Sequence, residues 1–227
     1  MSLKELISYF SDFYFTNLVM ISLSIILLIY GFYYFKKLQE LKIVIIYGIF
    51  SLIQTLITYY VLFIIPYDLN YIIEFSINIF LITEFLLFYL FFFLIIKSKY
   101  VKYLLLCLAC SFIIITIYHW KFTNELYKNP AQLTVIECFY MLIPALYYYI
   151  ELFQYSPIIN LRKESNFWIV TGIMFFFTTI IPLFLLKIFV FDPADPYYES
   201  LYSITYIAYS LLFIMFLIGC RCKVKKI

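Results

Sequence analysis

Apolar residues run along this chain in seven long stretches, and short polar segments separate them. Each stretch is close to the roughly 20 residues that an α-helix needs to cross the hydrocarbon core of a bilayer. We therefore predict an all-α fold, an integral membrane bundle of seven transmembrane helices. The predicted spans cover residues 15–35, 43–65, 71–96, 103–118, 133–155, 167–191 and 201–219.

The segment before the first span alternates apolar and polar positions, with Leu3, Leu6, Ile7, Phe10 and Phe13 as its apolar residues. This pattern is typical of a helix that lies in the membrane interface. We expect residues 1–14 to form such an interfacial helix, which leads into the first span. The whole chain, residues 1–227, is then a single transmembrane domain.

The overall composition supports this interpretation. Hydrophobic residues make up 66% of the chain and charged residues only 13%, and the mean hydropathy is +1.00. Soluble domains are about half apolar and about a quarter charged. The net charge of +3 is therefore a topology signal here, and we expect a lipid bilayer rather than a nucleic acid as the surrounding partner.

Basic residues are distributed unevenly between the two sides of the predicted bundle. Twelve of the sixteen lysines and arginines fall on one side, namely Lys36, Lys37, Lys42, Lys97, Lys99, Lys102, Arg162, Lys163, Arg221, Lys223, Lys225 and Lys226. Short loops rich in lysine and arginine remain in the cytoplasm. We therefore predict that the N-terminus lies outside and the C-terminus in the cytoplasm.

The sequence carries no pattern typical of a catalytic or metal site. Cys107 and Cys110 form a C-x-x-C pair inside a predicted span without a second pair, so we interpret both as buried small hydrophobic residues. The single histidine, His119, adjoins Trp120 at the end of that span, where both suit a membrane-interface belt. We predict a non-enzymatic protein with no metal and no cofactor.

Five ionisable side chains lie within predicted spans: Glu74, Glu84, Glu137, Glu151 and Lys187. A charge near the bilayer centre costs several kcal/mol, so such residues face the bundle interior and find partners there. Glu84 lies nearest the middle of its span. Interfacial water is therefore least available to Glu84.

Helical periodicity groups the polar residues of several spans on common faces. Glu74, Asn78 and Glu84 share one side of their helix, and Glu137 and Tyr140 belong to a stripe along theirs. The simplest packing turns these faces toward a common interior that is most polar in its outer half. The candidate ligand-binding residues are Glu74, Asn78, Glu84, Glu137, Tyr140, Lys187 and Tyr206.

Gln54 lies near the middle of the span at 43–65, which a tight turn joins to the span at 71–96. We predict a hydrogen bond between Gln54 and Glu84, with Glu84 protonated because desolvation disfavours a charged carboxylate. An alternative is that the ionisable residues form purely structural pairs. Glu151, for example, would then meet Lys97, Arg162 or Lys163 at the inner surface.

Two prolines, Pro144 and Pro182, lie inside predicted spans. Each removes a backbone donor and frees the carbonyl four residues earlier, at Tyr140 and Thr178, so we expect both helices to kink.

A resemblance to one group of proteins is carried by two segments, YIIEFSINIFLITEFLLFYLFFFLIIKS at 71–98 and NFWIVTGIMFFFTTIIPLFLL at 166–186. They resemble uncharacterised seven-helix membrane proteins of Bacteroidota, which are related to the membrane portions of sensor kinases. The resemblance implies a bacterial inner (plasma) membrane location and a sensory or accessory role. We expect a ligand, a lipid or a separate membrane or cytoplasmic signalling protein as partner. The alternative is a proton- or ion-coupled transporter or channel that uses the buried glutamates.

Overall fold

The computed structural model describes residues 3–34, 41–64, 70–123, 131–155, 160–190 and 196–225. These residues form seven long α-helices and a short 3-10 helix, η3 (Leu161–Lys163), and none of them lies in a β-strand. The predicted all-α class is therefore confirmed for this part of the chain. The long helices are α1 (Leu3–Tyr33), α2 (Lys42–Ile64), α3 (Asn70–Ile95), α4 (Lys99–Thr123), α5 (Ala131–Tyr155), α6 (Ser165–Phe189) and α7 (Pro196–Lys225).

Five of the helices, α3 to α7, contain segments of 22 to 25 residues that are long and apolar enough to cross a membrane. An α-helix suits this environment because it satisfies its backbone hydrogen bonds internally. The described apolar segments of α1 and α2 are shorter, Asn17–Tyr33 and Lys42–Thr58. The chain is therefore a membrane protein.

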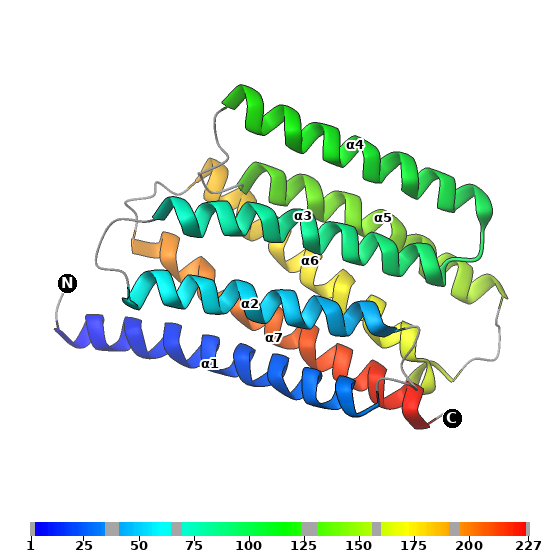
Figure 1. Ribbon diagram of the computed structural model, residues 1–227, viewed down its shortest axis with the longest axis horizontal. Helices are drawn as coiled ribbons and strands as arrows, with labels where there is room; N and C mark the ends of the chain where they lie inside the picture. The colour runs from blue at the N-terminus through cyan, green and yellow to red at the C-terminus, as the bar shows by residue number, and fades with distance from the viewer. Residues whose placement is uncertain are drawn as a thin grey trace.

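Consecutive helices run antiparallel, so α1, α3, α5 and α7 all begin at one end of the bundle (Figure 1). We call this end A and the opposite end B. Six helices pack in a closed ring in the order α1, α2, α3, α5, α6 and α7, and α7 returns to α1. The ring encloses a core that α2, α3, α5, α6 and α7 all reach.

Helix α4 lies outside this ring, against α3 and α5 (Figure 1). Only 17% of its membrane-length segment is buried inside the protein, against 39% to 44% for the segments of α3, α5, α6 and α7. Cys107 and Cys110 are exposed on this helix, so the prediction that both are buried is wrong. A peripheral helix presents most of its surface to the surrounding lipid, and its apolar residues then need no protein neighbours.

The predicted spans differ most from the observed helices at α4 and α7, which extend beyond residues 103–118 and 201–219 at both ends. The sequence analysis ended each span near its polar residues, but helical hydrogen bonding continues past the apolar segment. Helix α1 also runs without a break from Leu3, so the segment predicted as an interfacial helix at 1–14 continues directly into the first span. Its position in the interface stays a prediction.

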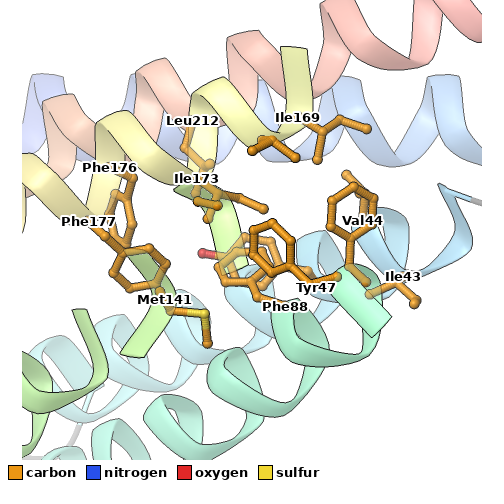
Figure 2. Close-up of a cluster of buried hydrophobic side chains, with 14 of the residues drawn as sticks. Ile43, Val44, Tyr47, Phe88, Met141, Ile169, Ile173, Phe176, Phe177 and Leu212 are labelled. Atoms are coloured by element: carbon orange, nitrogen blue, oxygen red, sulfur yellow. The ribbon is translucent and has the colours of Figure 1, made fainter. Parts of the chain in front are cut away.

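Aromatic side chains fill the centre of the ring. Tyr47 of α2 is fully buried, and its ring centroid lies 4.6 Å from that of Phe88 and 5.9 Å from that of Phe216. Figure 2 shows Tyr47 and Phe88 between Met141 and Phe177 on one side and Val44 on the other. Aromatic packing across five helices thus fixes the interior around one buried phenol.

Two glycines allow α6 and α7 to approach closely. A Cβ atom added at Gly172 would lie 2.8 Å from Cβ of Met215, and one added at Gly219 would lie 2.7 Å from Cγ1 of Ile169. At the same crossing, Ser165 Oγ donates a hydrogen bond of 2.8 Å to the Gly219 carbonyl oxygen. Between helices in lipid, close packing and interhelical hydrogen bonds supply much of the association energy.

We expect Gly172→Ala and Gly219→Ala to lower the thermal unfolding midpoint in detergent, because an extra methyl group in a packed contact costs about 1–3 kcal/mol. Gly48→Ala is the matched control, since its added Cβ would lie 3.3 Å from the end of the Leu27 side chain, which has room to adjust. Equal midpoints for the three variants would show that α6 and α7 do not depend on this contact.

Candidate functional site

Glu84 of α3 lies at the centre of the polar interior. Its side chain is 4% exposed, and its Oε1 accepts a hydrogen bond of 2.7 Å from the hydroxyl of Tyr47. The hydroxyl of Tyr209 on α7 interacts with the same carboxyl group. Two phenols from two neighbouring helices therefore satisfy this buried acid.

The predicted hydrogen bond between Gln54 and Glu84 is wrong. Gln54 Nε2 instead donates to Ser76 Oγ at 3.1 Å, eight residues before Glu84 on α3 and thus about 12 Å away along the helix axis. The prediction aligned the midpoints of two spans of unequal length. Antiparallel neighbours share the end where they are joined, so the longer α3 carries Glu84 past Gln54 to the level of Tyr47.

Glu137 of α5 is the second acid in this interior. Its side chain is 1% exposed, and it interacts electrostatically with Glu84. Within the described part of the chain, its Oε1 is buried without a hydrogen-bond partner. A buried polar atom in this state is costly, and in native proteins it points to a bound molecule or ion more often than an exposed one would.

Both carboxyl groups line one cavity of about 80 Å³ between α3, α5, α6 and α7. The half of the bundle nearer end A contains this cavity. Its polar lining also includes two threonines and a phenol, and its walls are aromatic and aliphatic: Ile77, Phe80, Leu81, Glu84, Thr134, Glu137, Phe176, Phe177, Ile180, Phe184, Thr205 and Tyr209. Phe176 and Phe177 mark the α6 wall in Figure 2.

Two of the predicted ligand-binding residues lie elsewhere, at the contact with α4. Asn78 accepts a hydrogen bond of 3.1 Å from Trp120 Nε1, and the Tyr140 hydroxyl accepts one of 3.2 Å from Ser111 Oγ. Neither residue is in the cavity lining. Helical periodicity placed them on the polar face, but that face is wide enough to serve both the cavity and the peripheral helix.

Glu74 and Lys187 lie closer to end A than the cavity does. They interact electrostatically across α3 and α6, and Lys187 is only 6% exposed. The Lys187 Nζ lies 4.9 Å from the ring centroid of Phe184, which lines the cavity. These two charges therefore sit beside the cavity rather than in it.

Tyr206 packs against the core, but Tyr209, one turn further along α7, lines the cavity. The sequence analysis also missed Tyr47. Its signal was available, because Tyr47 precedes Gln54 by two helical turns and so lies on the same interior face of α2. Phenols are abundant in this chain, with 25 tyrosines, so that signal did not distinguish Tyr47 from the others.

The carbonyl that Pro144 frees has a partner. The hydroxyl of Tyr89 on α3 donates a hydrogen bond of 3.0 Å to the Tyr140 carbonyl oxygen. Helices α5 and α6 run without interruption through Pro144 and Pro182, and the predicted kinks stay predictions. An interhelical phenol thus replaces the backbone donor that the proline lacks.

Glu151 of α5 has a structural partner at end B. Its Oε1 and Oε2 accept hydrogen bonds of 3.0 to 3.1 Å from the backbone N–H groups of Lys97 and Ser98, at the junction of α3 and α4. A carboxylate suits this place because the first N–H groups of a helix have no intrahelical acceptor. The structural alternative is thus confirmed for Glu151, through the backbone of Lys97 rather than its side chain.

Comparisons of this chain with protein-family models, with curated proteins and with solved structures gave no match.

We expect Tyr89→Phe to destabilise the protein by about 1–3 kcal/mol, because it leaves the buried Tyr140 carbonyl without a donor. In a Pro144→Ala background the same change should cost less, since residue 144 then supplies its own N–H. Thermal unfolding of the two single variants and the double variant measures this coupling. Tyr103→Phe is the control, because Tyr103 is 69% exposed. Additive effects would contradict the assignment.

Proposed function

We propose that the chain crosses a bacterial inner membrane seven times, with end A outside and end B in the cytoplasm. The antiparallel order of the seven helices supports this topology (Figure 1). So does the charge pattern, because Lys97, Lys99, Arg162, Lys163 and Arg221 all lie near end B, and short basic loops favour the cytoplasm.

We propose further that this protein is a non-enzymatic sensory or accessory membrane protein that binds a small ligand in the cavity. The observation that carries the proposal is the buried Oε1 of Glu137, which has no partner among the described residues and belongs to a side chain that lines the cavity. A ligand that donates to this oxygen would offset the cost of burying it.

The cavity is well placed to convert binding into movement. Four helices contribute to its lining, and a ligand there contacts all of them at once. The segments between helices are short, so a signal must leave through helix displacement to a separate protein. The resemblance to the membrane portions of sensor kinases is consistent with such a role.

We expect a partner protein to be crosslinked to the wild-type chain in a fixed ratio in native membranes, and its yield to change several-fold in Glu137→Gln. The amide keeps the size of the side chain but removes its charge, so it changes occupancy of the cavity rather than its shape. Glu164→Gln, at the start of α6 near end B, is the control and should behave as wild type. The proposal fails if no partner appears in a fixed ratio, or if its yield is the same in all three proteins.

A second candidate is proton- or ion-coupled transport. The observation that favours it is the order of ionisable groups on α3 and its neighbours, in which Glu74 and Lys187 precede Glu84 and Glu137 from end A inward. Intramembrane ionisable residues at successive depths are typical of ion paths.

Under this alternative, purified protein in liposomes should show proton or cation flux under an imposed membrane potential. Both Glu84→Gln and Glu137→Gln should then abolish the flux, because each removes a site on the path. Flux that is absent from the wild type, or unchanged in both variants, would exclude transport through this cavity. Glu164→Gln again serves as the control.

A further inference from the structure

The cavity between α3, α5, α6 and α7 combines buried carboxyl oxygens with aromatic faces. Its polar lining consists of oxygen atoms, from the carboxyl groups of Glu84 and Glu137 and from hydroxyl groups, and its walls include the rings of Phe80, Phe176, Phe177 and Phe184. We propose that it binds a small primary ammonium ion, between ammonium and ethylammonium in size. This inference rests on the proposed function and names the class of its ligand.

Charge is the first argument. Glu84 and Glu137 are both almost fully buried and interact with each other, and two carboxylates in one dry cavity repel. A proton on one carboxyl group and a monocation beside the other would neutralise the pair. A divalent ion or a neutral ligand would leave one of these balances incomplete.

Hydrogen bonding indicates where the cation lies. Glu84 already accepts a hydrogen bond from Tyr47 and interacts with Tyr209, whereas Oε1 of Glu137 has no partner among the described residues. A primary ammonium group has three N–H donors in a tetrahedral arrangement. One of them would meet Glu137, which leaves others for the hydroxyl oxygens of the lining.

The aromatic walls distinguish an ammonium ion from a metal ion. Hard metal ions are held by a shell of six or more oxygen ligands, and phenylalanine supplies none. The face of an aromatic ring attracts the N–H and C–H hydrogens of an organic cation, with a greater effect where water is excluded. Four phenylalanines from α3 and α6 contribute to this lining.

Size limits the ligand. The cavity has a volume of about 80 Å³, and a protein cavity of about 150 Å³ is needed to hold benzene. The ligand therefore has roughly half as many heavy atoms as benzene. This limit admits ammonium, methylammonium and ethylammonium and excludes bulky quaternary amines.

The nearby lysine does not oppose this assignment. Lys187 does not belong to the cavity lining, and its Nζ contacts the Phe184 ring at 4.9 Å. Its charge also interacts with that of Glu74. The positive charge beside the cavity therefore has an acidic neighbour of its own, and Glu137 remains for the ligand.

The test is direct binding of radiolabelled methylammonium to the purified full-length protein in detergent and amine-free buffer. We expect saturable binding of one ion per chain, with competition by ammonium and ethylammonium but not by sodium or N-methylglucamine. Glu137→Gln should weaken binding roughly 10- to 100-fold, because it removes a charged hydrogen bond. Glu164→Gln should bind as wild type.

Thr205→Val provides a second variant if Glu137→Gln does not fold, and it should weaken binding several-fold by removing one oxygen from the lining. Equal binding by wild type and Glu137→Gln, or equal competition by sodium, would overturn the ammonium assignment. If methylammonium does not bind but the crosslinked partner still depends on Glu137, the ligand class is wrong and the proposed function stands. If binding occurs without such a partner, the ligand class stands and the sensory role is wrong.

Discussion

The hydrogen bond from Tyr47 to Glu84 is the interaction on which the centre of this bundle depends. A phenol and a carboxyl group are both costly to bury among phenylalanine rings, and each removes that cost for the other. Their contact at 2.7 Å also fixes how far α2 and α3 are displaced along each other. With that register set, Glu84 reaches the cavity where Glu137 lies on the facing helix.

Helical periodicity was sufficient to predict that Glu84 and Glu137 share an interior, because both occupy the polar face of an otherwise apolar helix. It was not sufficient for Asn78 and Tyr140, which point toward α4. A periodicity argument gives the direction of a side chain relative to its own helix, but not which neighbour occupies that direction. The peripheral position of α4 is a property of the whole packing, and no short pattern in the sequence indicates it.

Partners across helices were harder to predict than the groups that need them. The sequence showed that Pro144 frees the Tyr140 carbonyl, but that the donor would be Tyr89 depends on the rotation of α3 about its axis. The failure of the Gln54–Glu84 pairing has a similar cause, since an error of two turns in relative depth is enough to exchange one partner for another. Depth was inferred from span midpoints, and α2 and α3 differ in length.

The buried acids of this protein separate into two kinds when their partners are compared. Glu151 receives backbone donors at a helix junction and so stabilises the fold, whereas Glu137 has a buried oxygen with no partner within the described residues. Interhelical polar contacts in membranes are satisfied within the protein wherever packing alone decides. An acid that the fold leaves unsatisfied beside a cavity is therefore better explained by a ligand than by stability, and a small cation is the ligand whose charge, donors and size match that position.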